Sequence, residues 1–224
     1  SFATKEYCLS NFIENVLTES DKMTIIADGV DHELKQIIDR SEAANIEILH
    51  ETLGSNGASF RFQIDLAASF PDGEIVLLQE DDYLYMPAHW PYRANTTYHE
   101  LIKEAMNFAE YVSFYDHPDK YLSPQFGGNK YITDQGVENT GIFRTENSHW
   151  KYTNSTTCTF ATTAKVIRQD QKIWKAFCAG NHPHDFQSFL ALGLRGRAVA
   201  TSLPGKSTHT EMPWLSPFFE QNFS

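Results

Sequence analysis

Three consecutive acidic residues, Glu80, Asp81 and Asp82, follow the apolar run at residues 75–78 and precede the aromatic run at residues 83–85. Hard divalent cations prefer carboxylate oxygens, and a nucleoside diphosphate needs such a cation to neutralise its phosphates. Acidic residues that only face solvent are usual on helix surfaces, whereas these end an apolar strand. We therefore expect a Mn²⁺ or Mg²⁺ site here in preference to a solvated strand end, although chance alone often produces three acids in so acidic a chain.

Among the nine histidines, His209 has the position best suited to metal binding. It lies in a loop of small residues after the strand predicted at residues 198–201, the last predicted strand, so its imidazole can reach the same edge of the sheet. We expect it to be a metal ligand. For His117, loop structure or capping is the favoured interpretation. Five others are interpreted as surface or hydrogen-bonded structural residues: His32, His50, His89, His99 and His149.

Asp185 lies in the first turn of a predicted helix that begins at Pro183. Two interpretations stay open from the residues alone. An acidic residue in the first turn stabilises the helix dipole. A carboxylate can also act as a general base that removes the proton of an attacking hydroxyl.

Short apolar runs alternate with amphipathic stretches through the first two-thirds of the chain. Apolar strands separated by helices indicate a mostly parallel sheet covered on both faces, so we predict an α/β fold. In such sheets ligands bind beyond the carboxyl ends of the strands, where we expect Asp28, the acidic triplet and Asp116 to converge. The predicted strands are at residues 23–27, 46–49, 75–78 and 111–115, and the predicted helices are at residues 9–16, 32–39, 60–69 and 98–109.

The rest of the chain is expected to extend this sheet and not to form a separate domain. We predict one domain over residues 1–224, with a first half at about residues 1–115 and a second half at about residues 116–224. The elements predicted in the second half are a loop at residues 116–139, a hairpin at residues 142–144 and 150–152, a strand at residues 156–161 and a helix at residues 166–178.

The 224-residue chain has 41% hydrophobic and 13% aromatic residues, which excludes a disordered chain. Eighteen basic and 29 acidic residues give a formal charge of −11, which argues against nucleic acid or an anionic membrane surface as partner. No apolar run approaches the roughly 18 residues of a membrane span. The three cysteines are too scattered for a disulfide framework and no signal peptide is recognisable, so we expect a cytoplasmic location.

The run that ends in Glu80-Asp81-Asp82 resembles the DxD-type motif, in its EDD form, of the GT-A glycosyltransferases, enzymes that use nucleotide sugars. The resemblance covers about residues 9–211. It implies that Asp82 binds the metal ion directly and that Glu80 and Asp81 contact the sugar or the ribose. The late histidine that completes metal coordination in many members of the family matches His209.

Further positions match the same family. Residues 24–29 resemble the strand whose terminal aspartate contacts the nucleobase, here Asp28, and the loop with Ser55 and Gly57 is similar to the one that packs near the nucleotide. The acidic residue that opens a helix and serves inverting members as base corresponds to Asp185. One departure is that the first strand of the family is not apparent at the start of this chain, so we expect part of the base-binding pocket to lie upstream.

The resemblance implies a metal-dependent enzyme that transfers a sugar from a nucleotide diphosphate sugar to a hydroxyl of a glycan or another acceptor, with inversion. A UDP-sugar is favoured as donor over a GDP- or dTDP-sugar. The first half of the domain would bind the nucleotide, and the second half would bind the acceptor and complete the metal site. The runs at residues 80–84 and 115–121 are similar to a bacterial and large algal-virus subgroup, for which the location would be the host cytoplasm.

Two other functions stay open. A sugar nucleotidyltransferase shares the sheet and the metal use, but it carries an early glycine-rich loop with a basic residue, which this chain lacks. A calcium-dependent carbohydrate-binding module is the non-enzymatic alternative, and Trp90, Trp150 and Trp214 are suited to stack on sugars in either case. Such a module is more often a β-sandwich, which the alternation of strands and helices argues against.

Overall fold

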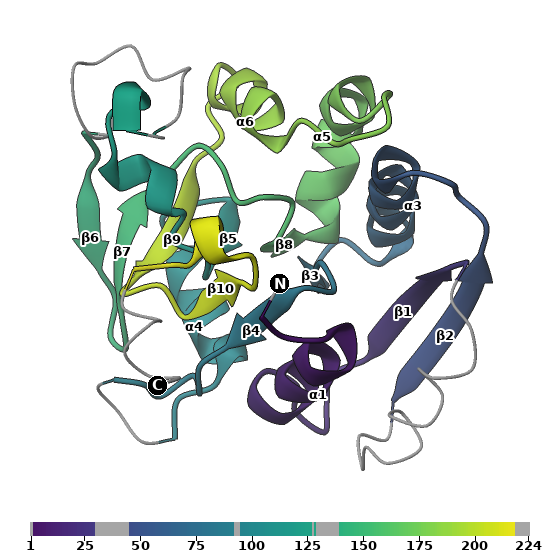
Figure 1. Cartoon of the computed structure of the whole chain (residues 1–224), viewed down its shortest axis with the longest axis horizontal. Coiled ribbons are helices and arrows are strands. Elements are labelled where there is room, and N and C mark those ends of the chain that lie inside the picture. Colours follow the sequence, from purple (N-terminus) through teal and green to yellow (C-terminus); the bar gives the residue numbers. More distant parts are fainter. Residues whose placement is uncertain (1, 30–44, 92–94, 127, 129–138, 218–224) are drawn as a thin grey trace.

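The computed structural model of the chain describes residues 2–29, 45–91, 95–126, 128 and 139–217. Over these residues the fold is α/β, with a six-stranded mixed sheet flanked by helices (Figure 1). Two sheets of two strands each are also present. The strands of the large sheet are, in spatial order, β3 (Ile75–Leu78), β8 (Phe160–Thr163), β5 (Tyr111–Ser113), β9 (Val199–Leu203), β7 (His149–Tyr152) and β6 (Ile142–Arg144).

The α/β class is confirmed, but the expectation of a mostly parallel sheet is wrong. Within the described large sheet only β5 and β9 run parallel, whereas β3–β8, β8–β5, β9–β7 and β7–β6 are antiparallel pairs. A strand that is covered on both faces carries a continuous apolar run whatever its direction, so such runs do not reveal how neighbouring strands are oriented. The hairpin of β6 and β7 is antiparallel because a short connection allows no other arrangement.

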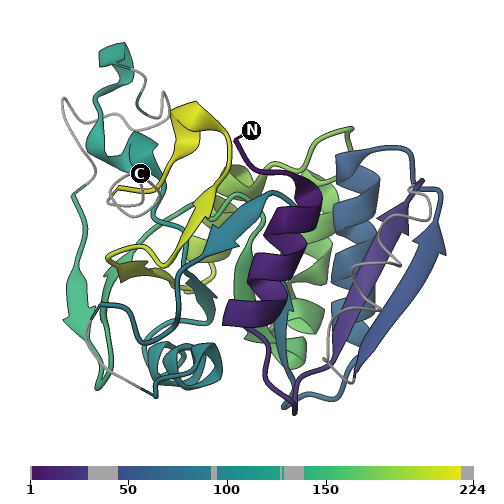
Figure 2. The same ribbon diagram turned by 60° about the horizontal axis from the view of Figure 1, so that its bottom comes forward.

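Five described helices are α1 (Lys5–Asn15), α3 (Asn56–Ser69), α4 (Tyr98–Ala105), α5 (Ala164–Phe177) and α6 (Asp185–Gly193). They lie on both faces of the large sheet (Figures 1 and 2). Because neighbouring strand residues point to opposite faces, Tyr111 packs in a core cluster with α3, α5 and α6, and Val112 packs in another with α1 and α4. The helix predicted at residues 32–39 lies outside the described residues.

The two-stranded sheets carry several candidate site residues. The strands β1 (Met23–Asp28) and β2 (Ile46–Glu51) are parallel, and Asp28 is the last residue of β1. The strands β4 (Tyr83–Tyr85) and β10 (Ser207–His209) are antiparallel. Because β10 follows β9, the strand predicted at residues 198–201 is not the last one. Three polar residues without an apolar alternation carry no recognisable strand pattern, which explains the omission of β10.

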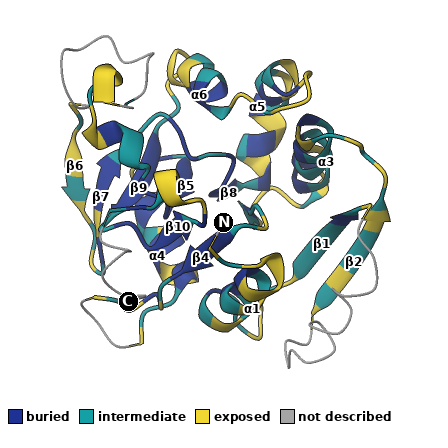
Figure 3. Ribbon diagram, in the orientation of Figure 1, coloured by how far each residue is buried: buried dark blue, intermediate teal, exposed yellow. Residues whose placement is uncertain are grey.

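Burial is concentrated along the central strands and the helix faces that meet them (Figure 3). The two largest fully buried side chains, Trp150 and Trp174, lie in different core clusters and therefore on opposite faces of the large sheet. Among the described helices, none has the length and apolar character that crossing a membrane requires. The sheet and its two cores form a rigid support for the turns at the strand ends, where the candidate site lies.

Candidate metal centre

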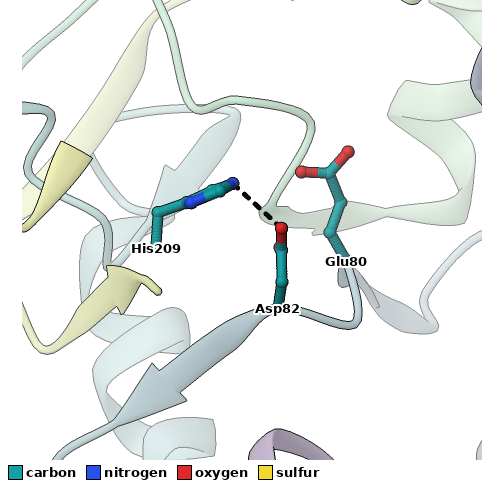
Figure 4. Close-up of side chains that lie close together, drawn as sticks. All are labelled: Glu80, Asp82 and His209. Carbon is teal, nitrogen blue, oxygen red and sulfur yellow. Dashed lines mark ion pairs between the residues drawn. The ribbon is translucent and has the colours of Figure 1, made fainter. Parts of the chain in front are cut away.

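Three side chains that the sequence singles out converge next to the large sheet: those of Glu80, Asp82 and His209 (Figure 4). One ligand atom from each lies within 4.8 Å of the other two. Glu80 and Asp82 come from the turn between β3 and β4, and His209 is the last residue of β10. All three residues are half-buried, so a cation between them would keep part of its coordination shell for other ligands.

The pairing of β10 with β4 places His209 beside the acidic turn. His209 and Tyr83 are directly opposite in the register, and their ring centroids are 5.2 Å apart. The backbone N–H of Thr210 donates to the carbonyl oxygen of Asp82 at 3.0 Å, which continues the contact between the two segments. Backbone pairing thus brings a histidine from the end of the chain to an acidic turn from its first half.

The two carboxylate oxygens of Asp82 have different surroundings. Oδ2 lies 3.0 Å from Nε2 of His209. Oδ1 is buried and has no hydrogen-bond partner among the described residues. A buried polar atom without a partner is destabilising, and a bound cation would satisfy it. The donor set of two carboxylates and one imidazole has the ligand types that Mn²⁺ or Mg²⁺ would accept, and Oδ1 of Asp82 would be free to bind such an ion.

Both ring nitrogens of His209 are engaged. Nδ1 accepts a hydrogen bond from the backbone N–H of Glu211 at 3.1 Å. In the neutral ring Nε2 therefore carries the proton and faces Asp82. Binding of a cation at Nε2 requires this proton to leave, so Nδ1 must become the protonated nitrogen and the Glu211 N–H must change its acceptor. Of the three candidate ligands, His209 would thus have to change its tautomer and one hydrogen bond to bind a cation.

The surroundings of Glu80 disfavour the ionised form of its carboxyl group. Burial, followed by the negative charges of Asp82, Asp185 and Asp81, raises the pKa of Glu80 to about 8. Its carboxyl group is therefore mostly protonated at neutral pH, and a divalent cation would supply the missing counter-charge. The backbone N–H of Glu80 donates to Oγ1 of Thr159 at 3.4 Å, which connects the acidic turn to the segment that leads into β8.

Asp81 does not point into the cluster with the other two acidic residues of its motif. Its carboxylate forms an ion pair with Lys5 of α1, with Nζ 2.5 Å from Oδ2. The hydrogen bond to Asp81 raises the pKa of Lys5. Both side chains are largely exposed, so the pair contributes little to stability and can exchange partners readily. The contact of Asp81 with a sugar or ribose stays a prediction.

Asp185, the candidate base, is the first residue of α6, and one of its oxygens is fully engaged. Oδ2 accepts hydrogen bonds from Ser155 Oγ at 3.0 Å, from the Thr156 N–H at 2.8 Å and from the Thr157 N–H at 2.7 Å. The side chain therefore fastens a loop to the start of α6, whose N-cap is His184. Oδ1 of Asp185 has no partner among the described residues and is the oxygen that can accept a proton.

The loop fastened by Asp185 has an uncommon backbone. Thr157 and Cys158 are in the left-handed region, with φ of 49° and 60°, which is unfavourable for residues that carry a Cβ. Strained positions of this kind cluster at functional sites, and this loop lies beside Glu80 through Thr159. Neither Thr nor Cys is a residue type that signals a left-handed turn, so the sequence could not reveal this loop.

Asp28, Ser55 and Gly57, the residues expected near the nucleotide, all serve the connection from β2 to α3. Oδ1 of Asp28 accepts a hydrogen bond from the Leu53 N–H at 2.7 Å. The hydroxyl of Ser55 caps α3. A Cβ at Gly57 would lie 2.1 Å from the carbonyl oxygen of Gly180, so only glycine fits there without rearrangement. Between described residues, no hydrogen bond or ion pair links this set to Glu80, Asp82 or His209, and a nucleotide contact stays a prediction.

Two further residues in the segment that follows β5 have structural partners. Asp116 is buried, and its Oδ1 lies 2.6 Å from the ammonium nitrogen of Lys151. Asp116 is therefore used inside the fold and is not available at the edge of the sheet, contrary to expectation. His117 is the N-cap of a 3₁₀ helix at Pro118–Tyr121 and accepts from the Asp119 N–H at 3.2 Å, which confirms the capping interpretation.

No known protein family matches the sequence, and no curated protein is significantly similar to it. The functional assignment therefore depends on the geometry and chemistry of the site itself.

Proposed function

We propose that the protein is a metal-dependent glycosyltransferase that moves a sugar from a UDP-sugar to a hydroxyl group of an acceptor. The observation that carries this proposal is the convergence of Glu80, Asp82 and His209 beyond a strand of the sheet, with a buried oxygen of Asp82 that lacks a partner. These residues have the ligand types to hold Mn²⁺ or Mg²⁺.

The diphosphate of the donor is both the group to be bound and the leaving group. A divalent cation would neutralise it, and three protein ligands leave about three positions of an octahedral shell for phosphate oxygens. The formal charge of −11 on the chain disfavours an uncompensated diphosphate. Asp82 and His209 would hold the ion, and Glu80 would become ionised as the ion offsets its neighbours.

Asp185 is proposed as the proton acceptor. The hydroxyl oxygen of the acceptor forms a bond to the anomeric carbon while Oδ1 of Asp185 takes the hydroxyl proton. The bond from the anomeric carbon to the diphosphate breaks on the opposite side. A single displacement of this kind inverts the anomeric configuration. The three hydrogen bonds to Oδ2 orient the carboxylate. The charge of Asp185 also contributes to the raised pKa of Glu80, which supports its closeness to the cluster.

The first test measures UDP binding by calorimetry with and without Mn²⁺. The wild type should bind UDP only when the metal is present. Asp82→Ala should abolish this metal-dependent binding, because it removes the oxygen that marks the ion position. Glu19→Ala, which removes an exposed carboxylate without described partners, is the matched control and should bind as the wild type does. Unchanged UDP binding in Asp82→Ala would overturn the assignment of the metal centre.

The second test separates transfer from the two alternative functions. Incubation with Mn²⁺ and either UDP-glucose, UDP-galactose or UDP-N-acetylglucosamine should release UDP slowly, by transfer to water. A sugar nucleotidyltransferase would instead join UTP to a sugar 1-phosphate and release pyrophosphate from the UTP. A carbohydrate-binding module would turn over neither set of compounds.

A further inference from the structure

Of the three tryptophans that suit sugar stacking, Trp214 is the one with a well-exposed side chain. Trp150 is fully buried in the core, and Trp90 is half-buried below the ammonium group of Lys206. Trp214 is 38% exposed. It ends a short 3₁₀ helix, Met212–Trp214, which follows β10 and is part of the exposed segment beside it (Figure 3).

The backbone of Trp214 is held firmly without the use of its ring. Its carbonyl oxygen accepts a hydrogen bond from the hydroxyl of Tyr115 at 2.7 Å, and its N–H donates to the carbonyl of Glu211 at 2.8 Å. The N–H of Ser216 donates to Oγ1 of Thr208 at 2.8 Å, which fixes the chain on the other side. The indole N–H has no partner among the described residues. The backbone position of Trp214 is thus fixed, while its ring is partly exposed and keeps an unused hydrogen-bond donor.

His117 completes one side of this surface. Its ring centroid lies 5.3 Å from that of Trp214, with the planes inclined at 49°. Nδ1 of His117 is engaged by Asp119, through the backbone N–H at 3.2 Å and a contact of 2.7 Å with Oδ1. Nε2 has no partner among the described residues. The surface therefore combines an apolar ring face with two unused nitrogen atoms.

This surface is connected to the candidate metal centre by packed aromatic rings. His209 contacts Tyr83, Tyr83 contacts Tyr115, and Tyr115 contacts His117, each with ring centroids 5.2 Å apart. The segment that carries Trp214 also begins at His209, whose Nδ1 accepts from the Glu211 N–H. Trp214 is therefore connected to the candidate metal centre both along the chain and through packed rings.

We propose that Trp214 and His117 form a subsite for a hexopyranose ring. The C–H face of a pyranose is apolar and matches an indole ring, and its hydroxyl groups can pair with the indole N–H and with Nε2 of His117. The carboxylate of Asp119 contacts His117 and the chain carries a charge of −11, so a neutral ligand is favoured over an anionic one. That this ring belongs to the acceptor rests on the proposed function, whereas sugar binding itself does not.

The experiment is saturation-transfer NMR with methyl glycosides of glucose, galactose and mannose, without nucleotide and with EDTA. At least one glycoside should receive saturation, mostly at the ring protons of one face. Trp214→Ala should weaken its binding on the order of tenfold, and Trp214→Phe should restore part of it. Phe108→Ala is the matched control, since Phe108 is also well exposed but stacks on Phe143, and should bind as the wild type does. Choline, tested in parallel, should receive no saturation.

The results distinguish this subsite from the proposed function. Asp82→Ala should bind the glycoside normally although it cannot bind UDP with metal. If UDP release fails but the glycoside binds through Trp214, the subsite stands and the protein is a carbohydrate-binding one. If Trp214→Ala binds the glycoside as the wild type does, if no glycoside binds, or if choline binds in its place, the subsite is overturned. A lower affinity of Trp214→Ala for UDP-glucose, with unchanged affinity for UDP, would assign the ring to the donor and not to the acceptor.

Discussion

Burial shifts the pKa values of Lys206 and Glu80 so that the neutral form of each side chain is favoured. Burial lowers the pKa of Lys206 to about 8, and burial with neighbouring acids raises that of Glu80 to about 8. Lys206 donates to the carbonyl of Ala88 at 3.0 Å and to that of Trp90, so backbone oxygens take the place of an acidic partner. The carboxyl group of Glu80 has no hydrogen-bond or ion-pair partner among the described residues, which makes it the better residue for a test.

Replacement of Glu80 by Gln should change how stability depends on pH. The pKa of Glu80 is raised in the folded state, so its stabilising contribution is complete below about pH 4.5 and is lost as the pH rises through about 8. In EDTA the wild type should lose stability relative to Glu80→Gln between pH 5 and 8, by at least about 1.4 kcal/mol, the equivalent of one pKa unit. Urea unfolding at several pH values measures this difference, with Glu19→Gln as the exposed control. If the stabilities of the wild type and Glu80→Gln change in parallel with pH, ionisation of Glu80 does not destabilise the folded state.

At the scale of elements, the start of α6 and the loop before β8 act as one unit. Asp185 accepts three hydrogen bonds from residues 155–157, and the two left-handed positions, Thr157 and Cys158, end and directly follow this stretch. The loop then continues to Thr159, which contacts the backbone of Glu80. Asp185 therefore has a structural role that is visible in the fold and a chemical role that is proposed, and different substitutions separate the two.

Asp185→Asn keeps an oxygen for the loop but cannot accept the proton, whereas Asp185→Ala loses both functions. The Asn variant should remain close to the wild type in stability and lose on the order of 10²–10⁴ in turnover, with UDP affinity nearly unchanged. The Ala variant should in addition lose about 1–3 kcal/mol of stability, because buried loop donors lose their acceptor. Thermal unfolding and UDP release measure the two effects. Wild-type turnover in Asp185→Asn, or a product with the anomeric configuration of the donor, would limit Asp185 to its structural role.

The connection from β2 to α3 makes a second prediction at this scale, on the choice of base. Oδ1 of Asp28 is used by the Leu53 N–H, which leaves Oδ2 to accept from the imide N–H of uracil. With Mn²⁺, UDP should raise the melting temperature more than GDP at equal concentration. Asp28→Asn keeps an acceptor for Leu53 but presents an amide donor to the base, so it should lose this advantage without a change in unliganded stability. Equal protection of the wild type by UDP and GDP would show that Asp28 does not select the base.

For the whole molecule, the sequence predicts positions of elements better than their pairing. The apolar run at residues 75–78 identified β3 and the acidic turn after it, because a buried strand has a strong local pattern. His209 was predicted as a partner of Asp82 from its place after a strand, and this convergence is observed. The direction of β8, the strand β10 and the bonds from Asp185 to residues 155–157 depend on contacts between distant segments, for which no local pattern exists.

The net charge of the whole chain leads to a last prediction, on salt. With a formal charge of −11 the protein attracts divalent cations over a distance set by ionic strength, from about 30 Å at 0.01 M salt to about 3 Å at 1 M. The affinity for Mn²⁺ at Glu80, Asp82 and His209 should therefore fall severalfold between these salt concentrations, because long-range attraction by the rest of the chain is screened. Binding of a neutral methyl glycoside at Trp214 should stay unchanged over the same range, which makes it the internal control. Calorimetry with MnCl₂ and NMR with the glycoside, at both salt concentrations, measure the two affinities. If the affinity for Mn²⁺ does not change with salt, only the immediate ligands attract the ion and the net charge of the chain has no effect. If the affinity for the glycoside falls in parallel, salt perturbs the folded structure and the loss of Mn²⁺ affinity is not evidence for long-range attraction.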